Sequence, residues 1–461
     1  MRRKALSDRD FALCLDCIPD PKAIMSPLSK PPVSSPVPSS SLSRLAGLGG
    51  MAAGIGGRML LGAARQLASG QRPKMSDLLL TPANAMKVTQ QLAQMRGAAL
   101  KVGQLMSMDT GDFLPREFAE VLSRLRADAD HMPPQQLRTV LDRDWGKGWI
   151  SRFARFDVRP IASASIGQVH RAQTKDGRDL AIKVQYPGVR QSIDSDIANV
   201  AGLLRLSGLV PKALDMAPLL DEAKSQLHEE ADYLREGAQL ARFGSLLADR
   251  PEFQVPRLHE DLSGPDVLAM DFIESRPIEE LSQAPQAERD RVVTLLIRLV
   301  LDELFTFNLM QTDPNFANYR YNPKTAQIVL LDFGATRAFD QGIALQYRAL
   351  MNAPDRPAIR QAAIDIGYFD AANPAAIQDA LLDMMEVVLT PLRMQAPFDF
   401  ATTDLPQKMR DMGFSIGMER EFAHVPPMDV LFLHRKAGGL FLLAQKLQAC
   451  ISLAPLLEVH A

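Results

Sequence analysis

Residues 310–334, MQTDPNFANYRYNPKTAQIVLLDFG, constrain the fold more than any other stretch of the chain. Asp313 and Asn318 lie five residues apart in a segment stiffened by Pro314, and Asp332 ends an apolar run that is typical of a buried strand. Phosphoryl transfer needs a divalent metal held by carboxylate or amide oxygens, and a carboxylate that orients the nucleophile. The spacing predicts Asn318 and Asp332 as metal ligands and Asp313 as the catalytic base.

Phosphoryl transfer by this loop also requires a lysine that reaches the nucleotide phosphates and a helix glutamate that holds it. Lys183 fits the first role, because it lies in the apolar strand pattern LAIKVQ, where an unpaired ammonium is costly to bury. The helical segment HEEADYLREG offers Glu230, Asp232 and Glu236, and one regular helix cannot direct all three inward. We predict that Glu236 pairs with Lys183, with Glu230 as the alternative.

Two further segments are predicted to contact a nucleotide. The Ala-Ser-Ala-Ser loop, residues 162–165, stands where protein kinases place a glycine-rich loop. Alanine allows less backbone freedom than glycine, so we expect a more restricted nucleotide site, lined by Ala162, Ala164 and Ser165. The connector between lobes, whose backbone would bind the adenine edge, is predicted at Met270, Asp271, Phe272 and Ile273.

The order of sequence patterns predicts a helical extension, a small sheet and a larger helical lobe. Residues 20–43 are rich in proline and serine and are predicted to be disordered. Residues 45–67 form a glycine-rich apolar stretch, which is either a plain docking helix or a segment with a membrane-surface or helix-pairing role. Helical patterns cover residues 81–107, 115–126, 194–206, 217–246, 286–310 and most of the chain after 340. Alternation around a Lys-Asp-Gly turn predicts two antiparallel strands within residues 162–188, and a second strand pair ends near residue 273. The boundaries expected are 1–43, 44–150, 151–274 and 275–461.

The composition excludes several classes of function. A net charge of −2 gives no surplus of basic residues for nucleic acid. Three cysteines exclude a disulfide scaffold, and Cys14 and Cys17 have no second pair that would complete a zinc site. No run of about 18 apolar residues predicts a membrane span. We expect a protein of a reducing compartment.

These motifs together resemble the UbiB (aarF-domain) family of atypical kinase-like proteins, over roughly residues 42–453. The matching segments are Lys101-Val-Gly-Gln104 as the KxGQ motif, the alanine-rich loop with SIGQVH, Glu230-Ala-Asp232 as the ExD motif, and the pair of motifs in residues 310–334. Gln311-Thr312, where a protein kinase carries His-Arg, is similar to the coenzyme Q biosynthesis branch. Ser163 departs from the usual Ala-Ala-Ala-Ser, and the C-terminal paired membrane spans of UbiB proper are not found in the sequence.

The resemblance implies an α+β, atypical protein-kinase-like two-lobed fold, with a β-sheet N-lobe, a helical C-lobe and an N-terminal helical extension bearing KxGQ. It implies ATP and Mg²⁺ as cofactors. The helix with Lys101 and Gln104 would fold over the cleft, where Lys101 pairs with Glu230 or Asp232, takes part in catalysis or inhibits it, and occupies the space of a protein substrate. His170 is expected to point outward from its strand, and Arg337 to pair locally or to neutralise phosphate.

The resemblance also implies a role in ubiquinone biosynthesis at a membrane. The expected partners are ubiquinone precursors or biosynthetic enzymes, with membrane contact through residues 45–67 and a homodimer as one candidate assembly. We expect a cytoplasmic protein, peripheral at the bacterial inner membrane, or a mitochondrial protein in a eukaryote. Because no Ala-Pro-Glu follows Asp-Phe-Gly, a protein acceptor is disfavoured. The alternatives are a nucleotide-switched scaffold or lipid-extraction protein without phosphotransfer, and a small-molecule phosphotransferase.

Overall fold

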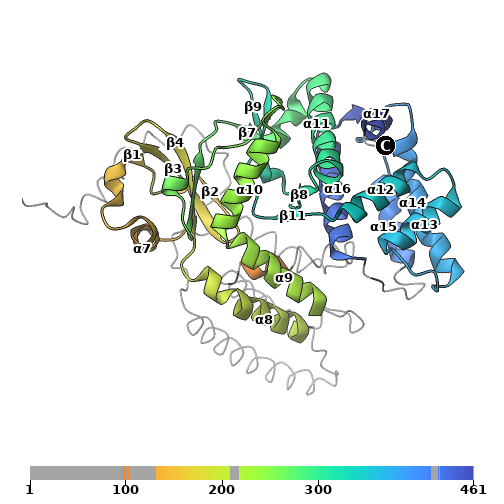
Figure 1. The fold of residues 1–461 in the computed structure, drawn as a ribbon, viewed down its shortest axis with the longest axis horizontal. Coiled ribbons are helices and arrows are strands. Elements are labelled where there is room, and N and C mark those ends of the chain that lie inside the picture. Colours follow the sequence, from red (N-terminus) through yellow and green to blue (C-terminus); the bar gives the residue numbers. More distant parts are fainter. Residues whose placement is uncertain are drawn as a thin grey trace, which may run out of the picture.

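The computed structural model describes residues 95, 97–99, 101–102, 131–207, 217–416, 424 and 426–459. The expectations for residues 1–43, 45–67 and 115–126, for Cys14 and Cys17, and for Gln104 concern residues outside this part of the chain. The described residues form two lobes. A small antiparallel sheet lies on one side of Figure 1 and a larger, mostly helical lobe on the other, which confirms the predicted α+β, kinase-like architecture.

The smaller lobe is built on a five-stranded sheet in the order β1–β3–β4–β6, with β2 paired to β3. Its strands are β1 (Phe153–Phe156), β2 (Ala162–Ser163), β3 (Gly167–Thr174), β4 (Asp179–Gln185) and β6 (Val267–Asp271). The predicted antiparallel pairing of β3 with β4 is confirmed, with Val169 opposite Lys183. Gly177 supplies the positive φ of 93° that the turn between them requires. Helix α7 (Pro134–Trp145) packs against β4.

The predicted strand pair ending at residue 273 is wrong in its pairing. The strand before β6 is β5 (Phe253–Gln254), and it pairs in parallel with β10 (Gln327–Leu330) of the larger lobe. Only an isolated bridge, Leu258 to Met270, joins the intervening segment to β6. The Arg257 amide donates to the Asp271 carboxylate and the Ala269 amide donates to Ser263 Oγ, so side chains take the donors that a longer ladder would use.

The predicted single helix over residues 217–246 is two helices, α9 (Ala217–Glu230) and α10 (Tyr233–Leu246). The break falls at Ala231 and Asp232. The Asp232 carboxylate accepts a hydrogen bond of 3.0 Å from the Arg235 amide and so caps the N-terminus of α10. Aspartate competes with helical hydrogen bonds in a helix interior and stabilises a helix start, which explains the break. Helix α8 (Val189–Ser207) precedes this pair and packs against α9.

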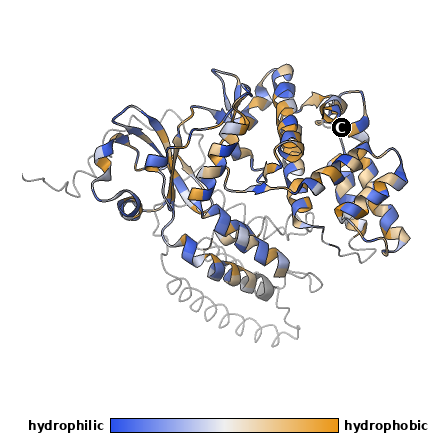
Figure 2. Ribbon diagram, viewed as in Figure 1, coloured by the Kyte–Doolittle hydropathy of each residue, from blue (hydrophilic) through white to orange (hydrophobic). Residues whose placement is uncertain are grey.

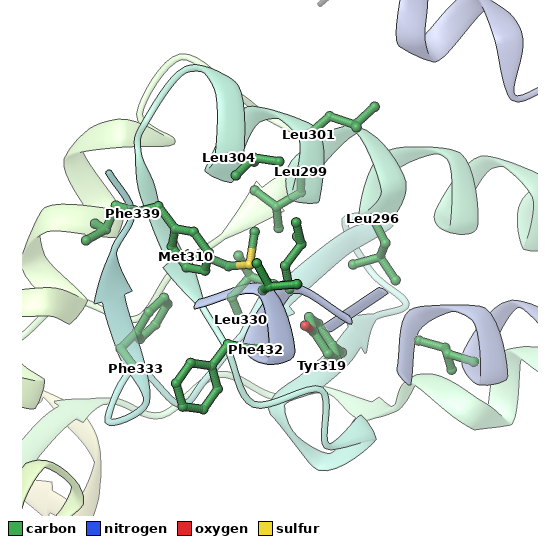
Figure 3. Close-up of a cluster of buried hydrophobic side chains, with 14 of the residues drawn as sticks. Leu296, Leu299, Leu301, Leu304, Met310, Tyr319, Leu330, Phe333, Phe339 and Phe432 are labelled. Atoms are coloured by element: carbon green, nitrogen blue, oxygen red, sulfur yellow. The ribbon is translucent and has the colours of Figure 1, made fainter. Parts of the chain in front are cut away.

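The larger lobe is organised around helix α11 (Gln286–Phe305). The other helices are α12 (Gln341–Asn352), α13 (Arg356–Ile366), α14 (Ala375–Arg393), α15 (Leu405–Phe414), α16 (Met428–Lys446) and α17 (Ala454–Glu458). Figure 2 shows apolar residues concentrated along α11 in the middle of this lobe. Figure 3 shows Leu299 and Leu304 of α11 close to Met310 and Leu330, so the helix anchors the segments that carry the predicted catalytic residues.

Short strands hold those segments in place. They are β7 (Arg276–Pro277), β8 (Leu309–Gln311), β9 (Tyr319–Asn322), β10, β11 (Thr336–Ala338), β12 (Phe398–Asp399) and β13 (Cys450–Ile451). Strands β9 and β10 form an antiparallel hairpin, and β8 pairs antiparallel with β11. The loop after β8 and the turn after β10 therefore emerge side by side, with Asp313 on the loop and Asp332 on the turn.

Candidate active site

Lys183 lies at the centre of the site. Its ammonium donates to both carboxylate oxygens of Glu236, at 2.8 and 2.9 Å, and lies 3.4 Å from Oδ2 of Asp332. Lys183 comes from β4, Glu236 from α10 and Asp332 from the turn after β10, so one ammonium joins the two lobes. The contact between Lys183 and Glu236 that the sequence predicts is present, while its role in nucleotide binding stays a prediction.

Burial and charge together set the ionisation of this pair. Burial alone would lower the pKa of Lys183, but the Asp332 and Glu236 carboxylates raise it well above its usual value. Burial raises the pKa of Glu236, and the nearby Lys183 ammonium opposes that rise. Lys183 is therefore a permanent cation at neutral pH, and it is held by a glutamate that is only 1% exposed.

A second lysine pair lies close to the alanine-rich loop. The Lys101 ammonium, 4% exposed, forms an ion pair with Glu230 Oε1, and Ser165 Oγ donates to Glu230 Oε2 at 3.1 Å. A Cβ added to Gly97 would lie 2.9 Å from Ile166 Cγ2, so the backbone four residues before Lys101 lies against the loop tip. The helix that carries Lys101 thus covers the loop.

The sequence left open which acidic residue Lys101 and Lys183 would each take. The break before α10 resolves this, because Glu230 ends one helix and Glu236 lies in the first turn of the next. Each of the two glutamates faces its own lysine, and Asp232 between them is not needed to face either. Asp232 caps α10, and Lys101 forms its ion pair with Glu230.

The alanine-rich loop is a tight antiparallel turn. Ala162 lies opposite Val169, and the Ala164 amide donates to the Gly167 carbonyl at 2.8 Å. A Cβ at Gly167 would lie 2.5 Å from the Val184 carbonyl oxygen, so only glycine allows β3 and β4 to approach this closely. Ser165 at the tip has its hydroxyl committed to Glu230 in this state.

The predicted base and metal ligands form one cluster. Asn318 Nδ2 donates to Oδ2 of Asp313 at 3.2 Å, and the Leu331 amide, next to Asp332, donates to the Asn318 carbonyl at 3.1 Å. Asn318 and Asp332 also line the same small cavity. Because the Asn318 nitrogen is the donor to Asp313, its side-chain oxygen is left to bind a cation. One amide oxygen and one carboxylate fit Mg²⁺, which takes few protein ligands together with phosphate oxygens.

The predicted connector follows β6. Met270 is buried, and the Asp271 carboxylate accepts from the Arg257 amide and His259 Nε2. The Phe272 amide donates to the Asp179 carbonyl at 2.9 Å. Within the described residues the Ile273 amide has no such partner, and the adenine contact of the connector stays a prediction.

Two expectations about single residues are decided by the structure. His170 does not point outward, because its side chain is fully buried and bonded to Gln168 and the Asp157 carbonyl. Arg337 is paired, at 2.6 Å from Glu222 and 3.5 Å from Glu229, but these glutamates of α9 lie more than 100 residues earlier, so the pairing is not local in the sequence. Neither residue contacts the cluster around Lys183 in the part of the chain that the structure describes.

The sequence did not predict the two residues of α16 that bind the loop carrying Asp313. Arg435 Nη2 donates to Oδ1 of Asp313 at 2.8 Å, and Lys436 Nζ donates to the Gln311 carbonyl at 2.6 Å. Both come from α16, whose sequence gives no sign of contact with a loop over 100 residues earlier.

A two-lobed fold with a strand lysine bound to a helix glutamate, beside an Asp-x4-Asn loop and an Asp-Phe-Gly turn, defines a kinase-like protein. Residues 124–356 match the model of the ABC1 atypical kinase-like domain. The chain belongs to this atypical kinase family, as the resemblance predicted. A kinase-like fold of this class implies nucleotide binding.

Relatives match over most of the chain. The atypical kinase COQ8, mitochondrial, of Saccharomyces cerevisiae is 37% identical over 92% of this chain and 85% of its own length. COQ8B, mitochondrial, of Rattus norvegicus is 36% identical over 92% of this chain and 80% of its own length. A solved structure of Rv3197 with erythromycin from Mycobacterium tuberculosis has a TM-score of 0.59 and 25% identity, and covers 82% of this chain and 95% of that one. Among the described residues, no helix has both the length and the apolar character of a membrane span.

Proposed function

We propose that this protein is an atypical kinase that binds Mg-ATP and acts as an ATPase or a small-molecule phosphotransferase. The observation that carries the proposal is the Lys183 ammonium, which contacts the carboxylates of both Glu236 and Asp332. Kinases use a strand lysine anchored on a helix glutamate, beside the Asp-Phe-Gly aspartate, to orient nucleotide phosphates.

Each residue of the cluster then has a part in the reaction. Lys183 binds the α- and β-phosphates, and Asn318 and Asp332 hold Mg²⁺, which neutralises phosphate charge when bound. Asp313 orients the attacking hydroxyl or water and takes up its proton. The loop of residues 162–165 covers the phosphates, and the backbone near Ile273 binds the adenine edge.

The segment after Asp-Phe-Gly argues against a protein acceptor. Arg235 Nη1 donates to the Gly334 carbonyl at 2.8 Å, and Thr312 Oγ1 donates to the Ala335 carbonyl at 2.8 Å. Strand β11 then pairs with β8, and α12 begins at Gln341. A segment tied down in this way has no long loop on which a peptide could lie, so a small molecule or water is the acceptor.

The relationship to the COQ8 proteins supports a role in ubiquinone biosynthesis. In this role the protein works at a membrane, with ubiquinone precursors or biosynthetic enzymes as partners and residues 45–67 as the membrane contact. The names of the relatives place them in mitochondria, and the bacterial counterpart of that location is the inner membrane. This part of the proposal rests on the relatives and on the sequence, and no contact among the described residues carries it.

The test is ATP turnover and Mg-nucleotide binding by the purified full chain, by Asp332→Asn and by Asp249→Asn. Asp249 is an exposed carboxylate just beyond the C-terminal end of α10, so its variant makes the same chemical change outside the cluster. Each protein is assayed with and without anionic liposomes and phenolic quinone-precursor analogues. We expect Asp332→Asn to lose Mg-dependent nucleotide binding and turnover, and Asp249→Asn to keep both. Equal activity of the two variants would refute the assignment of Asp332.

One observation favours a second candidate, a nucleotide-switched scaffold without phosphotransfer. Lys101 is buried in an ion pair with Glu230, and the backbone at Gly97 lies against the loop that would cover the phosphates. Tight Mg-nucleotide binding with no turnover in any of the conditions above would support the scaffold. Turnover with a phosphorylated small product, detected by mass spectrometry, would support the phosphotransferase.

A further inference from the structure

Helix α16 contacts the catalytic loop through two consecutive basic side chains. Arg435 donates to Oδ1 of Asp313 at 2.8 Å. Lys436 donates to the carbonyl and the side-chain oxygen of Gln311, at 2.6 and 3.1 Å, and lies 3.4 Å from a carboxylate oxygen of the buried Glu303. The helix therefore binds the loop both at Asp313 and two residues before it.

The backbone of the same helix lies directly on the loop. A Cβ added to Gly439 would lie 2.2 Å from Cβ of Pro314 and 2.7 Å from its Cγ, so this contact leaves no room for a side chain at 439. A Cβ added to the preceding Gly438 would meet nothing within 4 Å. Glycine is required at 439 by this contact, whereas at 438 it only weakens the helix.

The two donors on Asp313 fix the orientation of its carboxylate. Arg435 occupies Oδ1, and the Asn318 amide donates to Oδ2 at 3.2 Å. The Arg435 side chain is 10% exposed, so its charge is poorly screened by water. The loop sequence QTDPNFAN has no lysine or arginine of its own, and protein kinases carry an arginine just before the aspartate. The positive charge beside Asp313 comes instead from α16.

We propose that α16 is a working part of the catalytic apparatus. Arg435 is the positioning residue that orients the Asp313 carboxylate toward the acceptor. Lys436 and Gly439 fix the distance between the loop and the helix. This inference rests on the proposed function of Asp313. Misplacement of a catalytic group by about 1 Å can lower the rate on the order of 10²-fold, so a loss of these contacts should be measurable in turnover.

The first arm of the test compares Gly439→Ala with Gly438→Ala by hydrogen exchange. The two changes are identical in chemistry and adjacent on one helix, and differ in the contact with Pro314. We expect Gly439→Ala to speed exchange of the amides of residues 311–318 by at least about tenfold, and Gly438→Ala to leave it unchanged. Equal exchange in the two variants overturns the role of the helix, whether or not the protein turns over ATP.

The second arm measures kcat and KM for ATP in Arg435→Gln, Arg435→Lys and Asp313→Asn. We expect Arg435→Gln to lower kcat by about 10²-fold with KM changed by less than about twofold, and Arg435→Lys to recover about a tenth of wild-type kcat. Lys446→Gln, which removes an exposed charge from the end of the same helix, should be silent.

The outcomes separate the two proposals. Turnover that Asp313→Asn abolishes but Arg435→Gln and Gly439→Ala preserve would overturn the role of α16 and leave the proposed function standing. Turnover that survives in Asp313→Asn would instead refute the proposed function. A rise in KM with kcat unchanged in Arg435→Gln would also count against positioning, because a residue that orients the base acts on kcat.

Discussion

His170 links the stability of the smaller lobe to pH. Its Nδ1 donates to the Asp157 carbonyl at 2.8 Å, and its Nε2 accepts from Gln168 Nε2 at 2.9 Å. Gln168 cannot turn its amide around, because its oxygen accepts from the Met132 amide at 2.9 Å. The network therefore holds one neutral tautomer of the imidazole, and a proton on Nε2 would point at another donor.

The size of the effect follows from the pKa shift. Burial lowers the pKa of His170 from 6.5 to about 4. Below pH 6.5 the unfolded chain binds a proton that the folded protein does not, so acid favours unfolding. The contribution of the neutral His170 to the free energy of unfolding is fully present above about pH 6.5 and is lost as the pH falls toward about 4. At pH 5 the loss of unfolding free energy is about 2 kcal/mol.

The assay is urea denaturation of the wild type and of His170→Gln at pH 7.5 and pH 5.0. The variant loses hydrogen bonds at both pH values, so the quantity compared is the difference in unfolding free energy between pH 7.5 and pH 5.0, measured for each protein. We expect this difference to be about 2 kcal/mol smaller in the variant. His228→Gln, at a half-exposed histidine on α9, is the control and should not change it. An unchanged difference in His170→Gln would refute the reasoning.

Two further variants test the packing around the site. Gly167→Ala places a Cβ 2.5 Å from the Val184 carbonyl oxygen, and we expect it to cost about 1–3 kcal/mol of unfolding free energy. Gly202→Ala, where a Cβ meets nothing within 4 Å, should be neutral or stabilising. A lower unfolding free energy for Gly202→Ala than for Gly167→Ala would contradict the close approach of β3 and β4. Glu303→Gln leaves the buried Lys436 without its carboxylate and should cost about 3–5 kcal/mol; a cost below about 1 kcal/mol by thermal or urea denaturation would mean that the pair is not needed.

Local patterns were sufficient to predict the residues that form the core of the site. A lysine in an apolar strand needs an ionic partner wherever that strand lies, which made the pairing of Lys183 predictable from the sequence alone. Asp313, Asn318 and Asp332 share one short segment, so their spacing already limits how far apart they can lie. The helix break at Asp232 was missed because the apolar pattern continues through it, and the aspartate acts as a cap instead of a face residue.

The sequence by itself determined the class of protein, the lysine that needs an acidic partner, and the loop that carries Asp313. Only the tertiary structure decided what replaces the His-Arg of a protein kinase. Gln311 accepts from Lys436, and Asp313 accepts from Arg435, across separations of 125 and 122 residues. Periodicity and spacing report the neighbours of a residue along the chain, whereas these contacts depend on how α16 packs against the loop, where Gly439 lets the helix reach Pro314.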